Sequence, residues 1–144
     1  MERTSTMDRF RTQESIVAGF LSILNSAGMQ SSFGSNKTKP RYYRGYCPPE
    51  ATKKAIFLRY VADFNETVSS ADNDDFMRKT EIGGEIYTKN GYGDATYQLL
   101  CYNIERYCAQ NGYNIEWFGE DTDTSFDVNS PIAFKRFTVT KNKV

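Results

Sequence analysis

Two segments of the chain carry hydrophobic residues at the three- and four-residue spacing of an amphipathic helix. Residues 13–27 have this spacing, and Gly28 follows them at a position where glycine commonly ends a helix. The second segment begins after Asp94, a residue type that caps helix N-termini, and ends at Asn111 and Gly112. Its hydrophobic face consists of Tyr97, Leu100, Cys101, Ile104 and Cys108. We therefore expect two helices, each with one buried face.

Four further segments have the alternation and composition of β-strands: residues 55–64, 76–89, 113–120 and 132–140. The first is ambiguous, because its hydrophobic density would also suit a helix that starts after the preceding proline pair. Its period-two alternation favours a strand. The glycine pair inside the second segment predicts a bulge or a bend at that point.

Two segments between these elements read as loops. Residues 28–49 are dense in Gly, Ser, Asn and Pro, which leaves room only for a short strand around Tyr42 and Tyr43. Residues 66–75 are polar and acidic, which is typical of an exposed loop. The order of elements is then α-β-β-α-β-β. It predicts an α+β fold in which two helices pack on a mostly antiparallel, mixed sheet, as a single domain over residues 1–144.

Length and charge narrow the class of protein. A chain of 144 residues can bury one core but is too short for two ordinary domains. Its 18 basic and 18 acidic residues cancel, so we expect no specific nucleic acid as partner. No stretch approaches the length of a membrane span and the N-terminal residues lack the apolar run of a signal peptide, so no membrane partner is expected either.

The chain contains no histidine, which argues against the commonest forms of catalysis. Without it there is no Ser-His-Asp or Cys-His arrangement and no imidazole to bind a metal ion. The three cysteines, Cys47, Cys101 and Cys108, form no CxxC pair, which favours a reduced setting and no zinc site. We expect no enzyme, no catalytic residues and no cofactor. An enzyme would need a carboxylate pair with a raised pKa.

Three polar clusters are candidate ligand sites. The acidic stretch 72–75 and the aspartates Asp121, Asp123 and Asp127 lack the spacing of a calcium loop, and each suits a solvated loop or turn. The glycines in residues 91–93 precede a helix but lack a Walker lysine and a complete GxGxxG motif. No metal site is therefore expected.

Cations and aromatic residues alternate in the segment 41–46. Such a composition suits either a single-strand binding surface or a protein-contact hot spot, whereas the plain alternative is that the tyrosines cover the edge of the core. The balanced net charge favours protein contact over nucleic acid. The candidate contact residues are Arg41, Tyr42, Tyr43, Arg44 and Tyr46.

From Ser70 onward the sequence resembles the tail-terminator, or tail-completion, proteins of long-tailed bacteriophages, a family of minor tail proteins. Ala71-Asp72-Asn73 matches the family's loop, and Glu85-Ile86-Tyr87-Thr88 matches the end of the strand after it. Residues 96–109 supply the helix that follows, and residues 133–140 resemble the family's final strand. The predicted N-terminal helix also occupies its expected place.

This resemblance implies a structural virion protein. Copies would form a closed ring, a hexamer, at the head-proximal end of the tail, assembled in the host cytoplasm. The ring would cap the tail tube and join it to the head connector, so the partners are the chain itself, the tail tube protein and the head-tail connector protein. Ring closure needs a head-to-tail interface between unlike surfaces. As a hypothesis, the segment 41–46 and the acidic residues Asp72, Asp74 and Asp75 make these contacts.

Two alternatives stay open. One is a head-tail connector or stopper protein of the same tail machine. The other is a small phage inhibitor of host defence that binds a protein or a nucleotide ligand.

Overall fold

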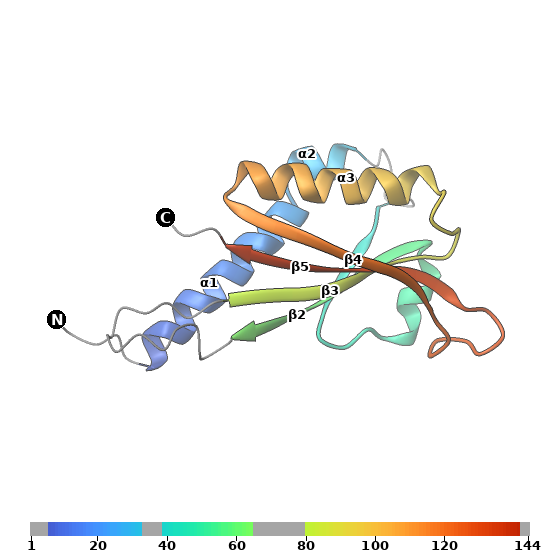
Figure 1. Cartoon of the computed structure of the whole chain (residues 1–144), viewed down its shortest axis with the longest axis horizontal. Coiled ribbons are helices and arrows are strands. Elements are labelled where there is room, and N and C mark those ends of the chain that lie inside the picture. Colours follow the sequence, from blue (N-terminus) through green and yellow to red (C-terminus); the bar gives the residue numbers. More distant parts are fainter. Residues whose placement is uncertain (1–5, 33–38, 65–79, 142–144) are drawn as a thin grey trace.

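The structure, a computed structural model, describes residues 6–32, 39–64 and 80–141 (Figure 1). Five strands form one sheet in the order β1-β2-β3-β5-β4. The strands are β1 (Arg41–Arg44), β2 (Ile56–Phe64), β3 (Thr80–Thr88), β4 (Tyr113–Asp123) and β5 (Ile132–Lys141). The helices are α1 (Thr6–Leu24), α2 (Ala27–Ser31) and α3 (Ala95–Gln110), with a short 3-10 helix, η1 (Pro49–Lys53), between β1 and β2.

The fold class was predicted correctly in its coarse form, as α+β with a mixed and mostly antiparallel sheet. Strand β1 runs parallel to β2, and the other neighbouring strands pair antiparallel. The expected order α-β-β-α-β-β was wrong, because the region 28–49 is not simply a long loop. Its residues 41–44 pair with β2 as a strand, with Tyr42 opposite Leu58, so the minor alternative of a short strand there is confirmed.

The boundaries of the first helix also differ from the expectation. Helix α1 starts at Thr6 and ends at Leu24. The expected start at residue 13 came too late, because hydrophobic spacing indicates only the part of a helix that packs on the core. Gly28 does not cap it and lies instead in α2, whose N-terminus is capped by the Ser26 hydroxyl accepting from the Met29 N–H at 3.4 Å. The Met29 side chain is buried, which anchors this single turn. The Asp94 cap of α3 is confirmed, with its carboxylate accepting from the Tyr97 N–H at 3.0 Å.

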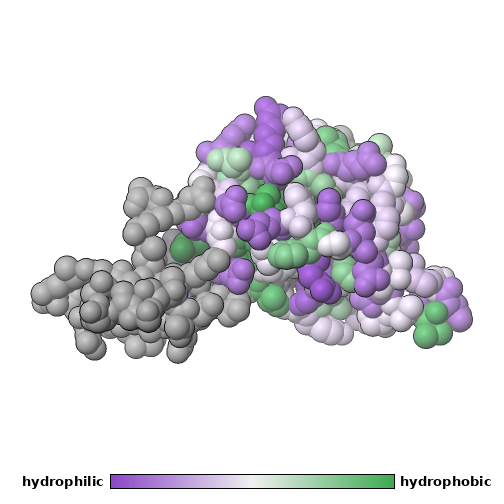
Figure 2. Space-filling model, viewed as in Figure 1, coloured by the Kyte–Doolittle hydropathy of each residue, from purple (hydrophilic) through white to green (hydrophobic). Residues whose placement is uncertain are grey.

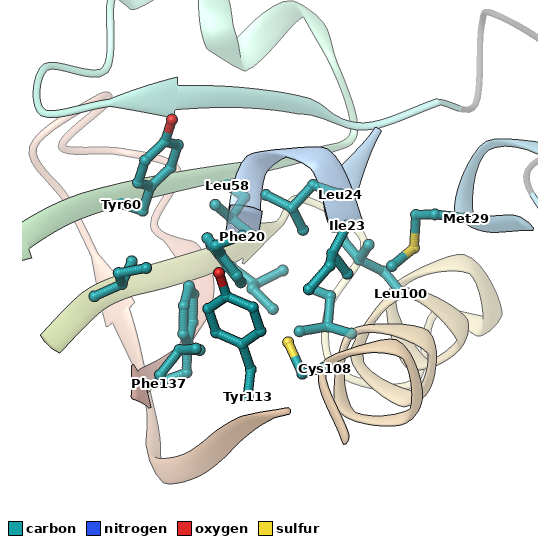
Figure 3. Packing of buried hydrophobic residues seen from close by; sticks show 14 of the residues in the cluster. Phe20, Ile23, Leu24, Met29, Leu58, Tyr60, Leu100, Cys108, Tyr113 and Phe137 are labelled. Carbon is teal, nitrogen blue, oxygen red and sulfur yellow. The ribbon is translucent and has the colours of Figure 1, made fainter. Parts of the chain in front are cut away.

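All three α-helices pack on the same face of the sheet. Phe20 of α1 lies between aromatic rings of three strands, with ring centroids 6.0 Å from Tyr60, 6.5 Å from Tyr113 and 6.2 Å from Phe137 (Figure 3). Leu100 of α3 closes the same core. In the described ranges no helix combines the length and apolar character needed to cross a membrane.

A smaller cluster lies on the opposite face of the sheet, near one end. It comprises Ala51, Phe57, Tyr87, Ile132 and Phe134. The only described elements over this face are η1 with its flanking loop and the turn between β4 and β5, so the described chain leaves the rest of the face open.

Gly83 and Gly84 form no bulge, contrary to the expectation. Strand β3 keeps continuous register with both neighbours through the glycine pair. Glycine suits position 84 because neighbouring atoms approach its Cα closely. A Cβ at this position would collide with the Arg59 carbonyl oxygen and lie 2.8 Å from the Phe137 ring. The irregularity of the sheet lies elsewhere, in β4 between Trp117 and Glu120.

Replacing Gly84 with alanine is expected to lower the free energy of unfolding by roughly 1–3 kcal/mol, because the new methyl group overpacks the core beside Phe137. Gly93→Ala is the matched control, since nothing lies within 4 Å of a Cβ built there. Urea unfolding monitored by circular dichroism gives both values. Equal midpoints for the two variants would contradict this account of Gly84.

Candidate functional site

The predicted contact segment 41–46 is built into the edge of the sheet. Tyr42 packs against the core on the helix side, and Tyr43 packs against the smaller cluster on the other side. Arg41 and Arg44 are exposed, and Tyr46, two residues after the strand, is 74% exposed. Two of the five residues are therefore packing residues, and three are accessible to a partner.

Tyr42 and Tyr43 are half-buried, and their hydroxyl groups point away from water. Burial raises the pKa of Tyr42 to about 12. The hydroxyl oxygens of Tyr42 and Tyr43 are buried and find no hydrogen-bond partner within the described part of the chain. The plain alternative, that these tyrosines cover the edge of the core, describes both of them. The other predicted contact residues, Asp72, Asp74 and Asp75, lie outside the described residues together with the expected loop 66–75.

A groove of about 840 Å³ opens on the face of the sheet that the α-helices leave uncovered. Its floor comes from adjacent positions of β2, β3 and β5, and its walls are the loop around η1 and the end of the β4–β5 hairpin. The residues that line it include Tyr46, Cys47, Arg59, Glu85, Tyr87 and Arg136.

An ion pair crosses the floor of the groove. The Arg59 Nε lies 3.2 Å from Glu85 Oε2, and the two residues are paired opposite each other in β2 and β3. Arg59 also donates to the Gly45 carbonyl at 2.9 Å, which ties the loop after β1 to the sheet. Their side chains are only 28% and 13% exposed, so this pair is more shielded from water than an ordinary surface ion pair.

A second guanidinium, that of Arg136, lies across from Glu85 on β5. It sits 5.6 Å from the centre of the Phe134 ring, and its side chain is exposed. Arg136 and Tyr46 together give the groove an accessible cation and an accessible aromatic ring, the residue types most often found in protein-contact hot spots.

Aromatic rings pack at the end of the groove nearest the hairpin. Phe57 and Tyr87 stack with centroids 4.8 Å apart, and Phe126 from the hairpin turn meets both rings edge-on. The Tyr87 hydroxyl donates to Asp123 at 3.4 Å, and burial together with the nearby Glu85 raises the pKa of this tyrosine. Tyr87 is therefore a neutral donor near physiological pH.

The aspartates expected in a turn after residue 120 are divided between strand and turn. Asp121 and Asp123 belong to β4, because they pair opposite Phe134 and Ile132. Asp127 is in the turn and accepts from the Asn129 N–H at 2.9 Å. Across the described ranges, no three Cys, Asp or Glu side chains converge as metal ligands.

The three thiols are held in their protonated form. Burial is the main cause that raises the pKa of Cys47 in the groove and of Cys101 on α3. For Cys108, burial raises the pKa to about 12. A thiolate is the reactive species, so these environments disfavour a nucleophilic role.

The sequence did not indicate Arg59, Glu85 and Arg136 as site residues, although Glu85 belongs to the strand motif that resembles tail-terminator proteins. They are distant in sequence, and only the strand register aligns them. The available signal was a charged residue between hydrophobic ones inside a strand, such as Arg59 between Leu58 and Tyr60, which indicates a second, wetter sheet face.

We expect the native protein to react slowly with an aromatic disulfide reagent near neutral pH, with rates that rise as the pH increases towards the raised thiol pKa values. Cys47, which is partly exposed, should react before the fully buried Cys108. A Cys47→Ser variant assigns the first reacting thiol. Rapid reaction of the native Cys47 thiol at neutral pH, as fast as free cysteine, would contradict this assignment.

No protein-family model matches the chain, and no curated protein matches it. The fold, the groove and the exposed edges of the sheet are therefore the observations on which a function can rest.

Proposed function

We propose that this chain is a structural component of a bacteriophage tail, a terminator whose copies join into a ring that closes the tail tube and meets the head connector. The observation that carries the proposal is the one-sided layering of the fold. All α-helices lie on one face of the sheet, and the described chain leaves most of the other face open, with a groove bordered by an exposed guanidinium and an exposed aromatic ring.

The order of the elements after residue 80 supports the same function. Strand β3, helix α3 and the closing strands β4 and β5 follow one another as the resemblance to tail-terminator proteins implies. The β4–β5 hairpin also extends beyond the layer of helices (Figure 1). An extended hairpin offers a neighbouring protein a surface that the compact core does not.

The chemistry of the groove supports contact with another protein rather than catalysis of a reaction. Arg59 and Glu85 neutralise each other, and Tyr87 is bonded to Asp123. Cys47 is held protonated by burial. The described surface in the view of Figure 2 is a mixture of hydrophilic residues with isolated hydrophobic ones, a composition usual for non-obligate protein interfaces.

The purified full-length chain should form rings, or join into rings at the ends of tails. Light scattering gives the mass in solution, and electron microscopy with and without assembled tails shows whether rings sit at one tail end. Antibody labelling of phage particles provides the location. A stable monomer or dimer that never occurs in virions would contradict the proposal.

A head-tail connector or stopper protein is the nearest alternative, because it also assembles in rings at the neck of the particle. The same labelling separates the two. A terminator is present on tails made without heads, whereas a connector or stopper is present on heads made without tails.

The volume of the groove favours one alternative of another class, a small inhibitor of host defence that binds a nucleotide. Arg136 would contact a phosphate, and Tyr46 would stack on a base. Calorimetric titration with nucleoside mono- and triphosphates tests this, with Arg136→Ala as the variant. We expect no saturable heat. Saturable binding that Arg136→Ala abolishes would favour the inhibitor over the terminator.

A further inference from the structure

The two edges of the sheet carry opposite charge. At one edge, β1 has two arginines and no acidic residue. At the other edge, β4 has the acidic residues Glu116, Glu120, Asp121 and Asp123 and no lysine or arginine. Since the strand order places β1 and β4 at opposite ends of the sheet, the two edges of the sheet differ in charge sign.

The basic edge is accessible. Arg41 is exposed, and Arg44 is exposed while it forms a two-bond contact with Glu14 of α1 at 3.0 and 2.9 Å. One of the two charges is therefore compensated within the chain. Tyr46, two residues beyond the strand and 74% exposed, adds an aromatic surface to this edge.

The neighbouring strand β5 has three cations, and each lies over an aromatic ring. Two of these rings belong to β4 itself, and Lys135 is also paired opposite Glu120 in the register. Lys135 is 4.6 Å from the ring centre of Trp117, Lys141 is 4.5 Å from that of Tyr113, and Arg136 lies over Phe134 in the groove. Glu116, Glu120 and Asp121 are exposed.

The acidic edge also presents an aromatic residue, at a point where the strand is irregular. The register of β4 against β5 shifts between Trp117 and Glu120, and Phe118 within this irregularity keeps 47% of its side chain exposed. An irregularity of this kind, together with charged side chains, discourages direct strand-to-strand pairing at a sheet edge. A partner at this edge is therefore held by side chains rather than by extension of the sheet.

We propose that the β4 edge of one copy docks against the β1 edge of a second copy of this chain. Glu116 and Asp121 face Arg41 and Arg44 of the second copy, while Phe118 lies close to its Tyr46. Each edge offers one charge sign and one exposed aromatic residue, so the two surfaces complement each other and neither complements itself. The inference rests on the proposed function and assigns the surfaces through which the ring forms.

This contact is heterologous, because the two surfaces differ. Repetition of such a contact gives a ring when the rotation between copies closes, and an open filament when it does not. Because the charged residues are exposed, the association should also weaken as ionic strength rises and the Debye length falls.

Charge reversal at one edge at a time tests the interface. The basic-edge variant is Arg41→Glu with Arg44→Glu, and the acidic-edge variant is Glu116→Lys with Asp121→Lys. Each reversal places like charges opposite each other, so we expect the concentration at half-assembly to rise roughly 100-fold. Analytical ultracentrifugation over a concentration series measures it for the full-length chain.

Mixing the basic-edge variant with the acidic-edge variant is the decisive experiment. The basic-edge variant presents glutamates at positions 41 and 44, and the acidic-edge variant presents lysines at the β4 positions that face them, so an equimolar mixture should assemble with copies alternating. A variant that has merely lost its fold would not be rescued in this way. Glu14→Gln controls for the broken ion pair with Arg44, and Glu105→Lys, on the exposed side of α3, controls for reversal of a charge elsewhere.

The outcomes separate the interface from the function. Rings that persist in both edge variants would overturn the interface and leave the terminator proposal standing. Filaments that break on single reversal and re-form on mixing would support the interface and contradict ring closure. A wild-type chain that stays monomeric at all concentrations, with and without tails, would overturn both.

Discussion

The burial of Phe20 against the sheet is the contact on which the rest of the fold depends. Its ring is fully buried and touches β2, β4 and β5 at once, so one side chain of α1 fixes the positions of three strands. Gly84 makes the contact possible, because its missing Cβ leaves space for the Phe137 ring on which Phe20 rests. The Tyr113 hydroxyl donates to the Ile16 carbonyl at 2.7 Å, and this bond also fixes the position of α1 along its own axis.

Because α1, α2 and α3 bury their hydrophobic residues on one face, the two faces of the sheet differ in hydrophobic burial. The helix side supplies most of the hydrophobic burial. The other face can then tolerate charged residues such as Arg59 and Glu85 in the middle of strands, where they form an ion pair across the sheet. The edge strands β1 and β4 carry charges of opposite sign, and within the described residues Glu14 of α1 pairs with Arg44 of β1.

The sequence predicts the parts of this fold that depend on local pattern, such as helices. It does not predict the parts that depend on which residues of neighbouring strands pair with each other. Helix α3 is recovered because its hydrophobic stripe and the Asp94 cap are both local signals. Strand β1 is only a minor alternative in the sequence, because four residues are too few for an alternation pattern and its partner β2 supplies the pairing. The glycine pair predicts a bulge or a bend, because sequence alone does not show that the Phe137 ring of β5 packs against Gly84. The groove is missed for the same reason, since Arg59, Glu85 and Arg136 meet only through strand pairing.

The parallel pairing of β1 with β2 has a further consequence for how this surface can vary. Antiparallel neighbours can be joined by a tight hairpin, whereas parallel neighbours need a connection that returns the chain to the starting end of the sheet. Here that return runs through Gly45 and η1, and it passes over the face that the α-helices leave uncovered. One wall of the groove is thus a by-product of strand direction rather than of core packing. Insertions or deletions in this return segment could reshape the groove for a new partner while the Phe20 core stays as it is, so recognition and stability are free to evolve separately.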